Sequence, residues 1–156
     1  MSLIAAGTGN TETPLEELAN NGFWPAVSPS DFRDVQRLDG TVTAPRLTHA
    51  LRTAMADVNR LLADYQAEQQ AAGIASAEEI PLEPWQIEGH HVQLYRRAVY
   101  SQAHAELLER YRDHSATGDG DERGEAKATA ADDVRADARW AIAELTGRTH
   151  STVELI

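Results

Sequence analysis

Residues 44–72 read APRLTHALRTAMADVNRLLADYQAEQQAA, and this stretch decides the fold class. Its apolar side chains recur every three or four residues, which is the period of one face of an α helix. The recurring residues are Leu47, Leu51, Ala54, Val58, Leu61, Leu62 and Tyr65. The pattern predicts one helix from Ala44 to Ala72, roughly 43 Å long at ~1.5 Å per residue. A helix of that length spans a small domain.

Three further helices are predicted on either side of this stretch. Residues 89–112 carry a second apolar face at the same spacing. That face consists of Val92, Tyr95, Val99, Ala103, Leu107 and Tyr111. A short helix over residues 28–39 begins with a capping serine and a proline, and a fourth runs from near Ala130 to a stop at Gly147. The sequence therefore predicts an all-α fold, a small helical bundle of about four helices of which two are long.

The composition divides the chain into three parts. Residues 1–22 are too polar to bury much surface, and we expect a flexible N-terminal arm there. Residues 23–148 form the helical bundle domain, and residues 149–156 alternate polar and apolar side chains as an extended C-terminal tail. Residues 73–88 connect two helices, and we expect three of their apolar side chains to fold back on the bundle. These are Ile80, Leu82 and Trp85.

Charge and cysteine content exclude several classes of protein. The 156 residues contain no cysteine, so disulfides and cysteine-ligated zinc are excluded, and a reducing cytoplasm fits. The net charge of −11 opposes the counterion release that drives most DNA binding. Much of the acidity lies in residues 1–22 and 113–137. No apolar run approaches 18 residues, so we expect a soluble protein without a targeting signal or a membrane partner.

No constellation of residues indicates catalysis, a metal or a cofactor. The six histidines show no metal-ligand spacing, and His90 and His91 are the only adjacent pair. The acidic run that begins at Asp119 fails as a calcium loop, because Arg123 and Ala130 occupy ligand positions. No nucleophile motif, phosphate loop or distinct acid–base pair is present. We therefore predict a protein that is not an enzyme.

Three blocks of the sequence together resemble the head completion (GPL-type) proteins of temperate myophages. The first, residues 41–59, reads TVTAPRLTHALRTAMADVN. The second runs from YRRAV at residue 95 to LERYR ending at residue 112, and the third is RWAIA at residues 139–143. Their order and separation match the family, as do AG at 72–73 and EIP at 79–81. The resemblance covers roughly residues 23–156.

The resemblance implies a structural virion protein that joins the DNA-filled head after packaging and stabilises it at the head–tail junction. Such a protein would be assembled in the bacterial host cytoplasm. Related head–tail adaptors are small helical bundles arranged as a ring, commonly of about twelve copies, on the portal. The implied partners are the portal protein ring, a tail-side connector or tail terminator protein, and other copies of this chain. Packaged DNA would pass through without specific binding.

Two other functions stay open at this stage. One is a small helical regulatory module that binds a protein partner. The other is a helical hydrolase or nuclease with a scattered carboxylate site. Neither accounts for the three matched blocks.

Two groups of residues are candidates for partner binding to the portal or a neighbouring ring. In the C-terminal tail they are Thr152, Val153, Leu155 and Ile156, which suit the addition of a β strand to a partner. The alternative is a tail packed on its own bundle. Phe23 and Trp24 form the second group, either as a partner-docking pair or as a hydrophobic lid on the bundle.

The acidic segment near residues 113–125 is predicted to be an exposed loop that lines the channel through which DNA passes. Its candidate residues are Asp113, Asp119, Asp121, Glu122 and Glu125. A ring of such loops would repel DNA and let it slide. A solvated loop on the outside of the assembly is the alternative.

Overall fold

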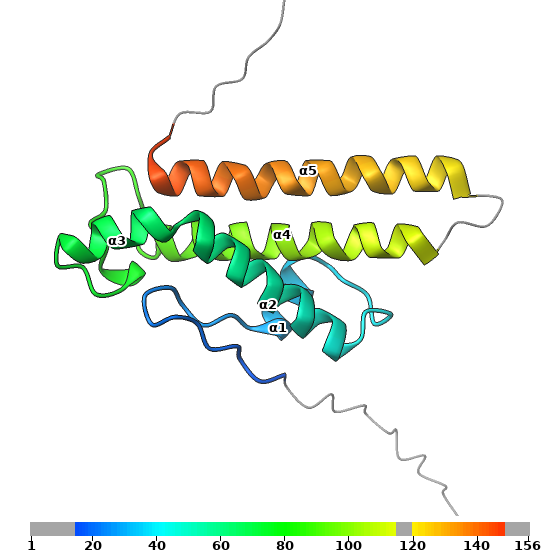
Figure 1. Ribbon diagram of the computed structural model, residues 1–156, viewed down its shortest axis with the longest axis horizontal. Coiled ribbons are helices and arrows are strands. Elements are labelled where there is room, and N and C mark those ends of the chain that lie inside the picture. Colours follow the sequence, from blue (N-terminus) through cyan, green and yellow to red (C-terminus); the bar gives the residue numbers. More distant parts are fainter. Residues whose placement is uncertain (1–14, 115–119, 149–156) are drawn as a thin grey trace, which may run out of the picture.

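Helix α4 (His90–His114) runs through the middle of the molecule, as Figure 1 shows. The computed structural model describes residues 15–114 and 120–148. On one side of α4 lies the antiparallel helix α5 (Gly120–Thr146), and on the other side α2 (Ala44–Leu61) crosses it. Helix α4 is therefore the central layer, with α2 and α5 on opposite faces.

The remaining elements are short. They are α1 (Pro29–Val35), α3 (Ala63–Ala71) and the 3₁₀ helix η1 (Ala77–Glu79). Helix α1 begins where the sequence predicts, because the Ser28 hydroxyl accepts a hydrogen bond of 3.1 Å from the Asp31 N–H. The all-α fold class is confirmed: the described residues contain no strand, only an isolated bridge between Leu18 and Val27. Among these residues no helix is long and apolar enough to cross a membrane.

The predicted single helix over residues 44–72 is wrong in one respect, because it is broken at Leu62. The backbone of Leu62 has φ −97° and ψ 6°, well away from the helical ψ of about −42°. Its N–H still bonds the Val58 carbonyl at 2.9 Å, and its own carbonyl accepts from the Gln66 N–H at 2.8 Å. The break leaves Leu62 fully buried and separates α2 from α3.

Helix α5 begins at Gly120 and not near Ala130, so the predicted acidic loop is shorter than expected. Acidic residues are common in loops, but they also stabilise the first turns of a helix, where the helix dipole is positive. Where the side chains of α5 are described, the buried positions follow a heptad-like spacing of seven, three and four. They are Ala131, Ala138, Ala141 and Leu145. Small side chains at these positions let α5 lie close to α4.

Two expectations about connecting segments are corrected by the structure. The predicted arm over residues 1–22 does not extend to 22, because residues 15–22 lie against the bundle and Leu18 is buried. Residues 1–14 lie outside the described residues. In the connection to α4, Ile80 is buried as expected, but Leu82 and Trp85 are exposed. A proline stands next to each of these two residues, at 81 and 84, and the segment follows the surface.

Candidate functional site

Phe23 and Trp24 do not form a partner-docking surface in this structure, because both are buried with 3 % of their surface exposed. The Trp24 ring stacks on Tyr95 at a centroid distance of 4.7 Å and on Tyr65 at 6.4 Å. Phe23 meets it edge-on at 4.9 Å. Aromatic stacking of this kind stabilises a core beyond the area that it buries. These two residues therefore join residues 15–27 to α3 and α4.

A closed cycle of three side chains holds the same segment in place. The Asn20 amide donates to the Tyr95 hydroxyl at 2.8 Å, and this hydroxyl donates to the Asn59 carbonyl oxygen at 2.7 Å. The Asn59 amide donates back to the Asn20 carbonyl oxygen at 2.9 Å. Burial raises the pKa of Tyr95 to about 12, while the hydrogen bond from Asn20 acts in the opposite direction. The cycle satisfies polar groups that are partly buried at the edge of the core.

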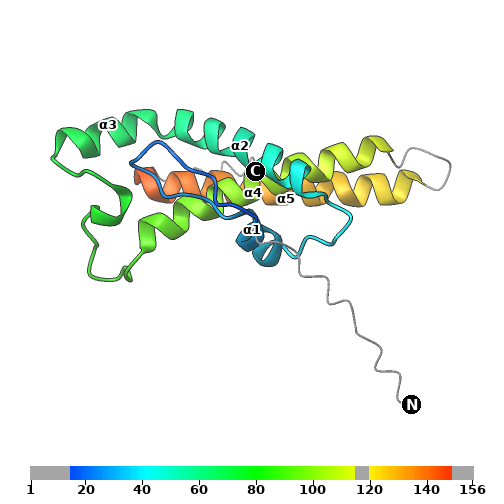
Figure 2. The same ribbon diagram turned by 90° about the horizontal axis from the view of Figure 1, so that it is seen from below.

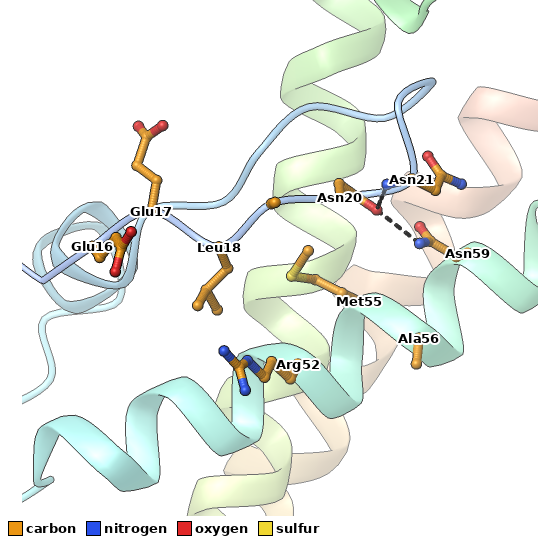
Figure 3. Close-up of a pocket in the computed structure, with 10 residues that line it drawn as sticks. Glu16, Glu17, Leu18, Asn20, Asn21, Arg52, Met55, Ala56 and Asn59 are labelled. Carbon is orange, nitrogen blue, oxygen red and sulfur yellow. Dashed lines mark hydrogen bonds between the residues drawn. The ribbon is translucent and has the colours of Figure 1, made fainter.

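A groove of about 700 Å³ runs beside this cycle, between the N-terminal segment and α2. Figure 3 shows the segment passing over α2, with Leu18 and Met55 pointing into the space between them. The lining residues are Glu16, Glu17, Leu18, Ala19, Asn20, Asn21, Arg52, Met55, Ala56 and Asn59. The groove thus combines apolar side chains on its floor with amides and charged groups at its rim.

A second candidate surface lies where α4 begins. Leu82, Trp85 and Ile87 are exposed, Trp85 by 67 % and Ile87 by 76 %. Trp85 contacts the His90 ring edge-on at 5.3 Å, and His90 Nε2 lies 3.3 Å from a Glu144 carboxylate oxygen near the end of α5. Several large exposed apolar residues within six positions are typical of a protein-binding surface. We name these three residues the apolar loop.

The predicted DNA-channel residues fall at the ends of two helices. Asp113 belongs to the last turn of α4, Asp121 and Glu122 to the first turn of α5, and Glu125 to the next. Asp119 lies outside the described residues. All the described positions sit at the tip of the α4–α5 hairpin, which projects beyond α1 and α2 (Figure 2).

The predicted tail residues, Thr152, Val153, Leu155 and Ile156, lie outside the described residues. Within residues 15–114 and 120–148, no group of three or more histidines and carboxylates is placed to hold a metal ion.

Sequence reasoning did not find the groove. Its floor and rim come from residues 16–21 and from α2, and the former were assigned to the arm. The one available signal is Asn59, a polar residue directly after Val58 on the helix face that otherwise carries apolar side chains. An asparagine there needs a buried partner, and Asn20 and Tyr95 supply it.

Comparison with known proteins gives a consistent result. The profile of the family described as phage head completion protein (GPL) matches residues 18–156. The chain is similar to the head completion/stabilization protein of Escherichia phage P2, with 33 % identity over 139 residues that cover 89 % of this chain and 82 % of the relative. It is also similar to the probable head completion/stabilization protein of Haemophilus phage HP1, with 26 % identity over 89 % of this chain and 91 % of the relative. No solved structure matches. The chain belongs to the phage head completion protein (GPL) family, structural components of the virion head and not enzymes.

Proposed function

We propose that this protein completes the DNA-filled head by forming a ring on the portal, as a connector between head and tail. The observation that carries the proposal is the family match, which spans residues 18–156 and so includes every described helix. The position at the head–tail junction and the ring of about twelve copies extend that family function.

The exposed surfaces support an assembly of several partners. The apolar loop leaves three large side chains in solvent, and Trp140 on α5 is 57 % exposed. Trp140 stands one helical turn before Glu144, which contacts His90 beside Trp85. Apolar surface of this kind is costly in a free protein and is stabilised when a partner covers it. We assign the apolar loop, in place of Phe23 and Trp24, to contact with the portal or the tail-side protein.

The acidic tip of the α4–α5 hairpin is proposed to border the DNA channel. Asp113, Asp121, Glu122 and Glu125 gather at a projecting end, where a ring could point them inward. Repeated negative charge around a channel would repel the DNA phosphates, so DNA would slide through without specific binding.

The C-terminal residues 149–156 are proposed to bind another chain of the assembly through main-chain hydrogen bonds, either in the portal, in a neighbouring ring or in the ring itself. Gly147 has φ +65° and directly follows Thr146, the last residue of α5, so the helix ends before residues 149–156. The β-branched residues that follow favour an extended strand over a continued helix.

To test the proposal, the purified protein is mixed with its cognate portal. The mass of the complex is then measured, and the complex is imaged. A ring bound to one end of the portal is the expected result. A stable monomer or dimer without affinity for the portal would contradict the proposal and favour a regulatory binding module. Replacing Glu122 and Glu125 with glutamine should then change DNA release from finished heads, and unchanged release would contradict the channel assignment.

A further inference from the structure

The N-terminal segment that lines the groove carries an unpaired backbone edge. The Leu18 N–H donates to the Val27 carbonyl at 2.8 Å, and the Val27 N–H donates to the Leu18 carbonyl at 3.0 Å. When two antiparallel residues exchange both bonds, the peptide groups of their neighbours point the opposite way. In this case the neighbours are Glu17 and Ala19, whose N–H and C=O groups bond no residue that the structure describes. Such an edge can accept another strand.

The unpaired edge belongs to the wall of the groove. Glu17 and Ala19, which carry this edge, are both among the residues that line the groove. Leu18 and Met55 supply an apolar floor, and Arg52 stands exposed on α2 at the opposite rim (Figure 3). Within the described part of the chain, Arg52 has no ion-pair partner. The groove therefore offers main-chain bonds, an apolar floor and one positive charge to an extended segment.

We propose that this groove binds residues 149–156 of a second copy of the chain as an added β strand. The inference rests on the proposed ring and identifies the contact between its subunits. In an extended strand Val153 and Leu155 lie on one side, where they would meet Leu18 and Met55, and Glu154 lies on the other, near Arg52. Main-chain bonds to Glu17 and Ala19 would fix the register.

The position of the two ends favours a second copy over the same chain. Residues 149–156 begin at the end of α5, whereas the groove lies on α2, on the opposite face of α4 (Figure 1). Two helix spacings of about 8–10 Å separate these faces. The eight residues reach at most about 26–29 Å when fully extended, so little length would remain to pair within one chain. A donor on one face and an acceptor on the other give a head-to-tail contact, which closes into a ring when the rotation permits.

Paired cysteines test the contact directly, because the natural chain contains no cysteine. The full-length variant Ala56→Cys with Val153→Cys carries one thiol in the groove and one in the segment, and Ala56 is exposed. Mild oxidation of rings on the portal should give a ladder of covalent oligomers, at least tenfold more than the control Ala67→Cys with Val153→Cys. Ala67 is exposed on α3 outside the groove.

Each outcome of this experiment is decisive. A cross-linked monomer of changed mobility would overturn the second-copy assignment in favour of the same chain. Rings of normal mass without cross-links would overturn the groove contact while leaving the proposed function intact. Failure to form any ring would overturn both the groove contact and the proposed function. Measuring the mass without oxidation distinguishes the absence of rings from rings that lack the groove contact. Cross-links from residues 149–156 to the portal, without covalent oligomers of this chain, would also overturn the groove contact.

A charge exchange provides a second test that does not depend on thiol geometry. Arg52→Glu should reduce ring formation about three- to tenfold, because it places like charges at the rim, and Glu154→Arg alone should do the same. The double variant should restore ring formation to within about twofold. Additive losses in the double variant would contradict the pairing of Arg52 with Glu154. Since Arg52 is exposed, the melting temperature of all three variants should stay unchanged.

Discussion

The two faces of α4 are packed by different means. Towards the N-terminal segment and α3, the contacts include large aromatic rings and the Asn20–Tyr95–Asn59 cycle, and α2 adds buried aliphatic side chains such as Leu51 and Val58. Towards α5, the buried residues among the described side chains of this helix are three alanines and one leucine, and ion pairs such as Arg97–Asp137 flank them. We name these regions the aromatic core and the alanine seam. A core of fixed shapes stabilises one arrangement, whereas a seam of small residues brings helices together with little buried area per residue.

The largest expected effect is the loss of Trp24 from the aromatic core. Trp24→Ala should lower the free energy of unfolding by about 3–5 kcal/mol, because it removes a buried ring that contacts Phe23, Tyr65 and Tyr95. Urea denaturation followed by circular dichroism measures it. Trp85→Ala is the matched control, since Trp85 is largely exposed, and it should change stability by less than about 0.5 kcal/mol. Equal losses of stability in Trp24→Ala and Trp85→Ala would contradict the assignment of Trp24 to a stabilising aromatic core.

The next effect concerns the hydroxyl of Tyr95. Tyr95→Phe leaves the ring in place but removes the acceptor of Asn20 and the donor to Asn59, and it should cost about 1–3 kcal/mol. Urea denaturation at pH 7 measures this loss. A cost near zero would show that the asparagines find other partners.

The same hydroxyl gives the aromatic core a pH dependence. Its pKa is raised to about 12 in the folded state, so between pH 10 and about 12 the unfolded chain loses a proton that the folded chain keeps. Since the unfolded state then binds fewer protons, stability is fully present below pH 10 and falls as the pH rises through this window. Tyr95→Phe should flatten this fall in an alkaline denaturation series. An unchanged slope would assign the fall to Tyr65 and Tyr100, whose pKa values are also raised by burial.

Overpacking tests the alanine seam. Ala141 is fully buried on α5, and Ala141→Leu should cost about 1 kcal/mol, the lower end of the range for an enlarged core residue. The cost is low because α5 packs mainly on one helix and can shift outward. The control Ala98→Leu, which enlarges a fully buried alanine of α4, should cost more because α4 is packed on two faces. Thermal denaturation measures the loss of stability in both variants. A larger loss in Ala141→Leu than in Ala98→Leu would contradict the view that α5 can shift outward.

The smallest effect is expected from the ion pair at the edge of the seam. Arg97 and Asp137 lie 2.9 Å apart with about half of each side chain exposed, and Arg97→Ala should cost about 0.2–1 kcal/mol. The cost should decrease in high salt, where exposed charges are screened. A double-mutant cycle with Asp137→Ala isolates the pair, and a larger, salt-independent coupling would show that charges and not alanines hold the seam.

The fold was largely predictable because its strongest signals are local. The spacing of apolar residues in α2 and α4 and the N-terminal cap of α1 depend on neighbours within one or two turns. The break at Leu62 was not predictable from spacing, because Leu61 and Leu62 are both apolar and continue the pattern. The start of α5 was missed because acidic residues suit a loop and a helix N-terminus equally well.

The candidate site was less predictable because its contacts are remote in sequence. Trp24 was open to two interpretations, and only its stacking on Tyr95 decides between them. The groove requires residues 16–21 to lie beside α2, and no periodicity in such a short polar stretch indicates this. The family resemblance, in contrast, depends on blocks of identical residues and needs no knowledge of contacts.

The cycle of Asn20, Asn59 and Tyr95 also has a consequence for the timing of synthesis. Asn20 precedes Tyr95 by 75 residues, which a ribosome adds in roughly 4–15 s at ~5–20 residues per second. During that interval Trp24 and the N-terminal segment have no complete α4 to pack against, because Tyr95 has not yet been made. Across the alanine seam, Arg97 and Asp137 are 40 residues apart, so the seam needs a shorter delay. The segment that is made first thus waits longer for its packing partner than α4 waits for α5.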